Sequence, residues 1–188
     1  MLYFIRFYGS AGFLEIPYGL GIVTGDNERF CLPEARENCI PVFKGSDIKR
    51  SGLKPPSVYI PSDFLLYQQV APLNLYLSPE KLIYRFISSE LVFFCDYEKR
   101  FILNSANMVV LNDDFPISHA QLCTMLNSKL MSWLFRKIFD THKVLRGDLE
   151  TLPIFNDYFN KNSFFNESKF LDFLSIEEVS SGAYRVKK

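Results

Sequence analysis

The chain has 188 residues, of which 48% are hydrophobic, 16% aromatic and 22% charged, and this composition excludes a disordered or low-complexity protein. Lysine plus arginine and aspartate plus glutamate both number 21, so the formal net charge is zero. This balance argues against a protein that coats nucleic acid or anionic membrane through bulk charge, while leaving room for a local basic groove. The length fits one medium-sized domain or two small lobes around a sizeable core.

Up to about residue 112 the sequence is a series of short β-rich runs broken by turn residues. Residues 2–8 and 20–23 are predicted strands, and glycines bracket the second of them. Residues 44–54 contain glycine, serine and aspartate and run into Pro55 and Pro56. This composition predicts a loop with room for one short helical turn.

The most apolar strands are predicted later in this half. Residues 81–87 and 91–95 are apolar or aromatic enough for well-buried strands. The polar residues 96–99 predict a turn into 100–104, and residues 107–111 then complete an antiparallel meander.

Beyond residue 112 the apolar period changes to that of a helix. Ser118 followed by Gln121 has the capping-box pattern, in which each side chain bonds to a backbone amide of the other residue. This predicts one long helix over residues 119–139, with apolar residues on several sides and therefore buried. A shorter helix is predicted over residues 167–174.

These elements predict an α+β fold with a twisted antiparallel sheet, one long buried helix and a short C-terminal helical tail. We assign residues 1–155 to the main domain and residues 156–188 to a helical extension of the same domain. No run approaches the ~18–20 apolar residues of a membrane span, and residues 1–8 do not resemble a signal peptide. We therefore expect no membrane partner and a cytoplasmic location.

Two arrangements resemble catalytic or cofactor motifs only in part. Residues 19–25 resemble a dinucleotide-binding loop, but the third glycine is one residue late and a turn follows instead of a helix. Asp96, Glu98 and Lys99 are the residue types of a nuclease site. They fall in a predicted hairpin turn, however, so they are interpreted as a solvated turn. The sequence therefore predicts no catalytic residue and no cofactor in this chain.

The cysteines do not follow a metal-binding spacing. There are four, with no CxxC pair, and they are interpreted as reduced and mostly buried thiols. His119 and Cys123 share one helix face, and Cys95 would have to supply a third zinc ligand from elsewhere. Core packing is the preferred interpretation, so no metal site is predicted.

The zero net charge divides unevenly along the chain. Residues 44–54 hold four basic residues and one acidic residue, and residues 129–146 hold five basic residues and one acidic residue. Residues 148–178 carry seven acidic residues against two basic ones. Such runs are commonly solvated faces, but the first two are also the local basic stretches that a phosphate backbone would need.

Five segments occur in a definite order along the chain: GIVTGDN (21–27), PVFKGSDI (41–48), EKLIYR (80–85), LNSKL (126–130) and DLETLPI (148–154). In this order they resemble the TaqI-like C-terminal specificity domain, the target-recognition part of adenine-specific DNA methyltransferases and fused restriction-modification enzymes. The resemblance covers roughly residues 14–155.

This resemblance implies a module that holds double-stranded DNA and reads its sequence for a separate catalytic domain or subunit. That partner would bind S-adenosylmethionine and flip the target adenine out of the duplex. The 188 residues contain no Asn-Pro-Pro-Tyr or Asn-Pro-Pro-Phe motif and no glycine-rich methyl-donor loop. We therefore expect methyl transfer to be carried out by a catalytic domain outside this sequence.

The DNA-binding candidates fall into two chemical classes. Basic side chains would neutralise phosphates, and amide or hydroxyl side chains can both donate to and accept from base edges. For the asparagines, turn and cap chemistry is an equal alternative. The basic candidates are Lys44, Lys49, Arg50, Lys54, Lys129, Lys143 and Arg146, and the polar candidates are Asn27, Asn104, Ser105 and Asn127.

Two alternatives to DNA recognition remain open at this point. The 19 Phe and 10 Tyr residues, together with a helix that is apolar on several sides, would also suit a protein-interaction or subunit-assembly module. The chain could also be a degenerate fragment that folds without binding anything.

Overall fold

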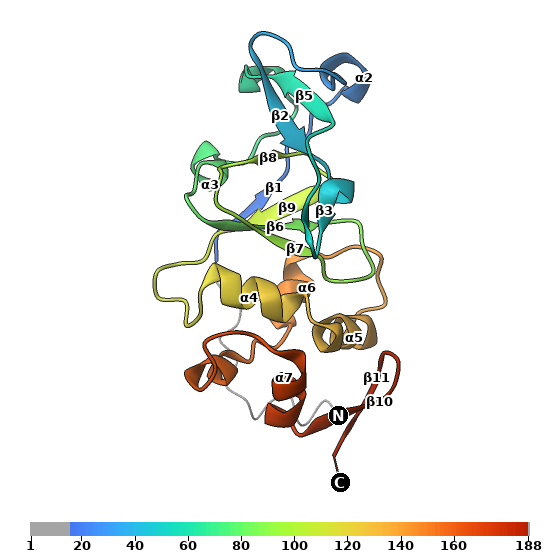
Figure 1. Cartoon of the computed structure of the whole chain (residues 1–188). Helices are drawn as coiled ribbons and strands as arrows, with labels where there is room; N and C mark the ends of the chain where they lie inside the picture. Colours follow the sequence, from blue (N-terminus) through green and yellow to red (C-terminus); the bar gives the residue numbers. More distant parts are fainter. Residues whose placement is uncertain (1–15, 188) are drawn as a thin grey trace.

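The centre of the fold is a four-stranded antiparallel sheet. In the computed structural model, which describes residues 16–187, its strands lie in the order β1-β9-β6-β7 (Figure 1). Strand β6 is internal and pairs with β7 on one side and β9 on the other. The predicted α+β class and antiparallel sheet are thus confirmed. The bounds are β1 (Tyr18–Leu20), β6 (Lys81–Arg85), β7 (Phe93–Asp96) and β9 (Ala106–Val109).

Both faces of this sheet are buried, because successive residues of a strand point to opposite sides. Leu82 and Tyr84 of β6 lie in one hydrophobic core with the helices of the second half of the chain. Ile83 lies in a second core, which is formed with the short strands of the first half. A strand covered on both faces is a continuous apolar run, and residues 81–87 have this pattern.

Short elements from the first half of the chain close the Ile83 side. Strand β2 pairs antiparallel with β5 and parallel with β8, and β3 pairs with β4. Short helical turns connect these strands. The elements are α2 (Asn27–Phe30), β2 (Cys39–Phe43), η1 (Gly45–Asp47), β3 (Ile48–Lys49), β4 (Gly52–Leu53), β5 (Val58–Pro61), η2 (Phe64–Leu66), α3 (Leu73–Tyr76) and β8 (Phe101–Ile102).

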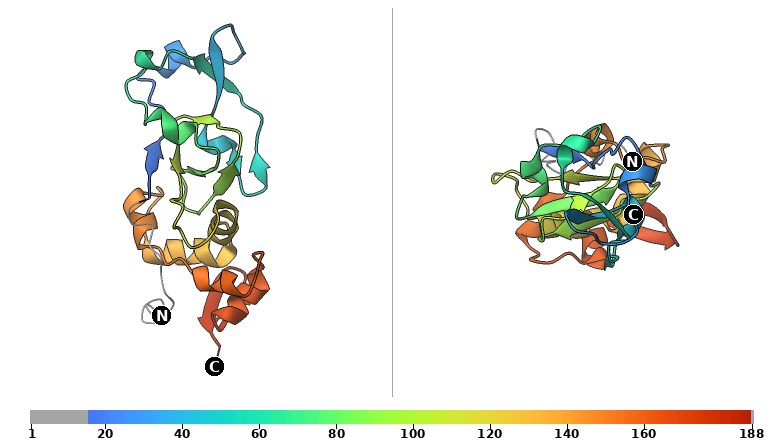
Figure 2. Two further views of the ribbon diagram at one scale, coloured as in Figure 1. Left: turned by 90° about the vertical axis from the view of Figure 1, so that its left-hand side faces the viewer. Right: turned by 90° about the horizontal axis from the view of Figure 1, so that it is seen from above.

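The second half of the chain covers the other face. Tyr158, Phe170 and Tyr184 share a core with Leu82, so residues after 155 pack on the same core as the sheet. The two cores stack with the sheet between them, which makes the molecule elongated (Figure 2). No helix in residues 16–187 is long and apolar enough to span a membrane. The elements are α4 (His119–Leu126), α5 (Lys129–Ile138), α6 (Arg146–Thr151), η3 (Asn156–Asn160), α7 (Glu167–Phe173), β10 (Ile176–Ser180) and β11 (Ala183–Val186).

The single helix predicted over residues 119–139 is two helices in the structure, α4 and α5. The predicted capping box is present, with Ser118 and Gln121 each accepting from the other's backbone amide. The break falls at Asn127, whose side chain bonds to the backbone of Phe93 in β7. Ser128 then caps α5 by accepting from the backbone amide of Met131, so a second helix begins. The predicted helix over residues 167–174 matches α7.

Other predicted elements differ in detail. Residues 100–104 do not continue the meander, because β8 leaves the central sheet and pairs with β2. The predicted strand over residues 20–23 is β1 followed by isolated bridges at Ile22 and Val23. The C-terminal tail contains the hairpin β10–β11 as well as a helix. The predicted strand over residues 2–8 lies outside the described residues.

A buried ion pair joins the start of β6 to the end of β7. Lys81 Nζ lies 2.6 Å from Asp96 Oδ2, and both side chains are fully buried. Lys81 also donates to the carbonyl of Tyr76, and Arg100 donates to Asp96 from its side chain and its backbone amide. Burial alone would raise the pKa of Asp96, but the hydrogen bonds from Lys81 and Arg100 outweigh it and hold the pKa below its ordinary value.

Replacing Asp96 by Asn should destabilise the fold strongly, because it leaves the ammonium of Lys81 buried without a counter-charge. We expect the free energy of unfolding, measured by urea denaturation at neutral pH, to fall by about 3–5 kcal/mol. Glu98→Gln is the matched control, since Glu98 is exposed and pairs only with Arg100 among the described residues. Its loss should stay below about 1 kcal/mol. Equal losses in the two variants would contradict this prediction.

The same variant should respond less to acid. A carboxylate whose pKa is lowered on folding stabilises the protein above its unfolded pKa of about 3.9, and this contribution is lost as the pH falls through the folded pKa. We therefore expect the unfolding free energy of Asp96→Asn to fall less steeply than that of the wild type below about pH 4.

Candidate nucleic-acid interface

A cluster of three cations lies where the β3–β4 hairpin meets the end of β6. Arg85 of β6 donates from Nε to the carbonyl of Ile48 at 2.8 Å, which places its guanidinium beside Lys49. The pKa of Lys49 is lowered, chiefly by the positive charge of Arg85 and further by burial and by Lys54. We call Lys49, Lys54 and Arg85 the basic cluster. Its members repel one another, so an anion bound there would relieve the repulsion.

The loop that carries this cluster is fastened at its start. The backbone amide of Lys44 donates to Asp47 at 2.8 Å, and that of Gly45 donates to Ser105 Oγ at 2.9 Å. A Cβ atom on Gly45 would lie 2.2 Å from the carbonyl oxygen of Ser105, so only glycine allows this close approach. The Asp47 carboxylate therefore accepts a hydrogen bond within the loop and orders it, instead of extending into solvent as a free charge.

A second feature is a polar depression of about 190 Å³, which we call the amide pocket. Three exposed side chains with amide groups, Asn27, Gln68 and Asn104, contribute to its lining. Asn27 accepts from Thr24 Oγ1 at 2.6 Å, which orients its side chain at the first residue of α2. Amides in this position can donate to and accept from an adenine edge.

The backbone behind the amide pocket is held by a short ladder of hydrogen bonds. Val23 and Gln69 exchange backbone hydrogen bonds at 2.9 and 3.1 Å, and the amide of Asn104 donates to the carbonyl of Ile22. Gly21 makes this crossing possible, because a Cβ there would lie 2.2 Å from the carbonyl oxygen of Leu103. Three segments that are distant in sequence are thereby fixed at one place.

Lys44 is a further cation, at the start of the loop that carries Lys49 and Lys54. Burial raises the pKa of the Cys31 thiol, and the nearby positive charge of Lys44 opposes this rise. Cys31 in turn contacts the Asn27 side chain at 3.6 Å. Lys44 therefore lies close to the amide pocket, and it precedes Lys49 of the basic cluster by five residues in the chain.

Three of the predicted residues are occupied by contacts within the protein. Arg50 donates to Ser132 Oγ at 2.7 Å, to the carbonyl of Leu91 and to Glu90. Ser105 accepts from Gly45, and the Asn127 amide bonds to both backbone groups of Phe93 at 2.9 Å. The structure thus gives Arg50, Ser105 and Asn127 structural roles, and we do not include them among the proposed DNA contacts.

The remaining predicted cations lie apart from the cluster or beside it. Lys143 pairs with Ile87, and its Nζ lies 5.7 Å from the centre of the Phe86 ring. Both contacts are with the residues that follow Arg85 in the chain. Lys129 begins α5, where its backbone amide bonds Glu167. Arg146 pairs with Glu150 at 2.6 Å. Among the described residues, Lys143 is the one of these three cations that contacts the segment directly after Arg85.

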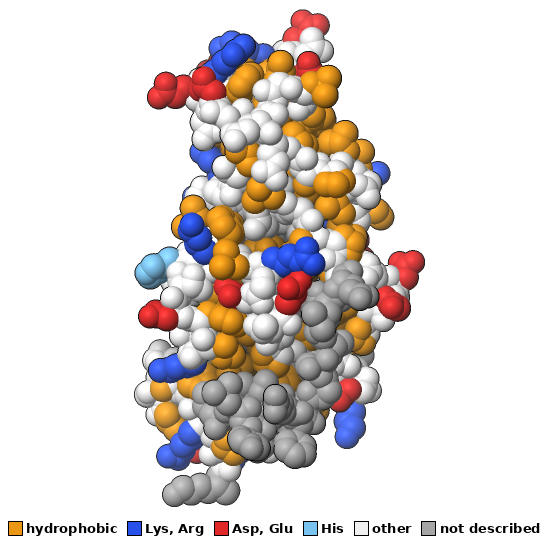
Figure 3. All heavy atoms as spheres, turned by 180° about the vertical axis from the view of Figure 1, so that it is seen from behind, with side chains coloured by type: hydrophobic (Ala, Val, Ile, Leu, Met, Phe, Trp, Pro, Cys, Tyr) orange, Lys and Arg blue, Asp and Glu red, His pale blue; other side chains and the backbone are white. Residues whose placement is uncertain are grey.

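Sequence reasoning missed Arg85 and Gln68. Arg85 ends a strand that was recognised only for its apolar residues, although the segment EKLIYR contains it. Gln68 lies in a segment without periodicity, and only the backbone exchange between Val23 and Gln69 brings it to the amide pocket. The face opposite to the view of Figure 1 carries scattered lysine and arginine side chains, some of them beside acidic ones (Figure 3).

His119 and the nearby thiols are used in packing. His119 Nε2 accepts from the backbone amide of Leu111 at 3.0 Å, and its Nδ1 lies 3.4 Å from Glu80. Burial raises the pKa of Cys95 to about 11 and that of Cys123 to about 12, so both remain neutral thiols at neutral pH. Within residues 16–187 no three His, Cys, Asp or Glu side chains lie close enough together to hold a metal ion.

The comparisons with known proteins identify the family. Residues 40–154, more than half of the chain, match the TaqI-like C-terminal specificity domain. The chain belongs to this family. A 35-residue segment is 71% identical to a protein described as "Type II methyltransferase M.VspI" from Vibrio sp. (strain 343). That segment covers 19% of this chain and 9% of the Vibrio protein, so the match spans a small part of the relative.

The matched region of the specificity domain contains most of the interface described above. The basic cluster, Lys44, Gln68 and Asn104 all lie within residues 40–154, and Asn27 lies before them. The hairpin β10–β11 lies after the matched region.

The close approach of Gly45 to Ser105 allows a specific prediction for the stability of the specificity domain. Gly45→Ala should lower the free energy of unfolding by about 1–3 kcal/mol, because the added methyl group must displace backbone. Gly147→Ala is the control, since a Cβ at this position of α6 meets nothing within 4 Å. It should stabilise the helix by about 0.5–1 kcal/mol. Urea denaturation followed by circular dichroism compares the two, and an unchanged midpoint for Gly45→Ala would contradict the prediction.

Proposed function

We propose that this chain recognises a specific sequence in double-stranded DNA on behalf of an adenine-specific methyltransferase of a restriction-modification system. The observation that carries the proposal is the occurrence of both a basic cluster and an amide pocket in a chain of the specificity-domain family. Methyl transfer from S-adenosylmethionine would be carried out by a catalytic domain or subunit, and this chain would present the duplex to it. The name of the Vibrio relative supports this assignment.

The two features would have different tasks. Lys44, Lys49, Lys54, Arg85 and Lys143 would bind phosphates and thereby set affinity and salt dependence without reading sequence. Asn27, Gln68 and Asn104 would read base edges, for which a paired donor and acceptor on an amide match N6 and N7 of adenine. The amide pocket lies beside Lys44, so phosphate contacts would position the duplex and the amides would specify it.

The phosphate-binding part is tested by removing charge from the basic cluster. The double variant Lys49→Ala/Lys54→Ala should weaken binding to all duplexes alike. The slope of log K against log salt should fall by about 0.9 for each phosphate that the variant no longer neutralises. Fluorescence anisotropy with a mixed-sequence duplex, between about 50 and 200 mM salt, measures both quantities.

Lys161→Ala/Lys169→Ala is the matched control, because it removes two exposed lysines from the acidic C-terminal part of the chain. An equal decrease of the slope in the control would show that only net charge matters. If the wild type binds no duplex above background at low salt, even with a methyltransferase catalytic subunit present, the proposed function is wrong. The protein-interaction module would then be the better hypothesis.

The base-reading part is tested at Asn104. Asn104→Ala should relax the preference at one position of the recognised site by about 1–3 kcal/mol and leave the salt slope unchanged. Selection from a randomised duplex library, followed by affinities for single-base variants of the selected site, measures this. The control is Asn74→Ala on α3, which removes an exposed asparagine outside the amide pocket. A uniform loss over all sequences would assign Asn104 to positioning instead of readout.

A further inference from the structure

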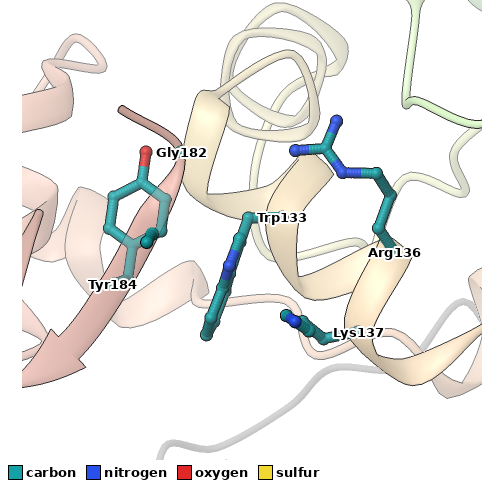
Figure 4. A pocket seen from close by; sticks show the side chains of 6 residues that line it. Trp133, Arg136, Lys137, Gly182 and Tyr184 are labelled. Atoms are coloured by element: carbon teal, nitrogen blue, oxygen red, sulfur yellow. The ribbon is translucent and has the colours of Figure 1, made fainter. Parts of the chain in front are cut away.

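A second pocket, of about 490 Å³, lies between α5 and the β10–β11 hairpin, outside the interface described above. Figure 4 shows Trp133 between Tyr184 on one side and Arg136 and Lys137 on the other. Trp133, Arg136 and Lys137 are three and four residues apart, so they share one face of α5. Gly182 and Tyr184 of the hairpin close the opposite side.

The chemistry of this pocket favours an anion. Burial raises the pKa of Tyr184 to about 12, so its phenol carries no charge at neutral pH. Arg136, Lys137 and no acidic residue are among the described residues that line the pocket. Glu90 pairs with Arg136 at 2.6 Å, whereas Glu178 keeps its negative charge near Tyr184 and accepts from the backbone amide of Gly182 at 2.9 Å. Lys137 is exposed and forms no ion pair with a described residue. Lys137 is therefore the cation that remains available to a ligand.

The aromatic rings of the pocket form a wall and not a stacking platform. The Trp133 and Tyr184 rings pack edge to face, with centroids 5.4 Å apart and an interplanar angle of 68°. Trp133 is 8% exposed and Tyr184 7%, so neither presents a free face to a nucleobase. An anionic group such as a phosphate suits this pocket better than a base.

A series of charged groups connects this pocket to the basic cluster. Glu90 accepts from Arg136 and also from Arg50 at 3.2 Å, and Arg50 directly follows Lys49 in the chain. Ser132, one residue before Trp133, receives the hydrogen bond from Arg50. Figures 1 and 2 show β3, α5 and the hairpin following one another along the same side of the elongated molecule.

We propose that the pocket between α5 and the β10–β11 hairpin binds a backbone phosphate of the duplex held by the basic cluster, with Lys137 as the neutralising cation. This inference rests on the proposed function and extends the DNA footprint beyond it. Lys137 lies within residues 40–154, whereas the hairpin that closes the other side of the pocket lies outside them. This contact would lengthen the row of phosphate-binding side chains along the long axis of the molecule.

Trp133 is the sole tryptophan of the chain, so intrinsic tryptophan fluorescence reports directly on this pocket. The full chain is titrated with a mixed-sequence duplex, and fluorescence and anisotropy are recorded together. We expect duplex to change the Trp133 emission. Lys137→Ala should lower the salt slope by about 0.9 and reduce that change, whereas Lys137→Arg should retain both. Lys169→Ala on α7 is the control and should behave as the wild type.

The outcomes separate this inference from the proposed function. Duplex binding with an unchanged salt slope in Lys137→Ala, or without any change in Trp133 emission, overturns the inference and leaves the proposed function intact. Absence of duplex binding by the wild type overturns both. An emission change with a polyglutamate peptide but not with duplex would overturn the phosphate assignment in favour of an acidic protein partner. The circular dichroism of each variant verifies its fold.

Discussion

The buried pair of Lys81 and Asp96 sets the register on which the rest of the structure depends. The two residues face each other in the β6–β7 ladder, so their contact fixes which residues of β6 point to each core. A slip by one residue would exchange Tyr84 and Ile83 between the two faces and disrupt both cores at once. Arg100 is drawn to the same carboxylate, which turns the chain out of the central sheet and into β8. Asn104 and Ser105 follow β8, so the amide pocket and the anchor of Gly45 also depend on this pair.

The structure changes how the local charges of the sequence are interpreted. The basic run at residues 129–146 loses much of its free charge, because Arg136 pairs with Glu90 and Arg146 with Glu150. In the run at residues 44–54, by contrast, Lys49 and Lys54 are joined by Arg85 from β6, and like charges accumulate. A zero net charge is thus compatible with one concentrated cationic site. In the proposed function, weak attraction outside that site would limit nonspecific binding to nucleic acid.

Local signals were sufficient for part of this fold. The capping box at Ser118, the helix over residues 167–174 and the apolar strands after residue 80 depend on neighbours in sequence, and each was predicted. The division of the helix over residues 119–139 into α4 and α5 was not predicted. It depends on the side-chain amide of Asn127, which bonds to the backbone of β7. The candidate site likewise contains residues that the local sequence predicts and residues that it does not. Lys44, Lys49 and Lys54 follow from composition, whereas Arg85 and Gln68 join through contacts between distant segments. The contact of Arg50 with Ser132 could not be predicted for the same reason, since the two residues are 82 positions apart.

The partners of Arg50 and Arg136 also constrain how the interface can move. Glu90 lies between the two guanidinium groups, and Arg50 reaches Ser132 as well, so the β3–β4 hairpin, the loop after β6 and α5 are fastened together. Gly45 and Ser105 fasten the other end of the same loop. A loop held at both ends loses little conformational freedom when a ligand binds, which lowers the entropic cost of association. In the proposed function, Arg50 would therefore not bind a phosphate itself, and its contacts within the protein would hold the neighbouring Lys49 in place for the ligand.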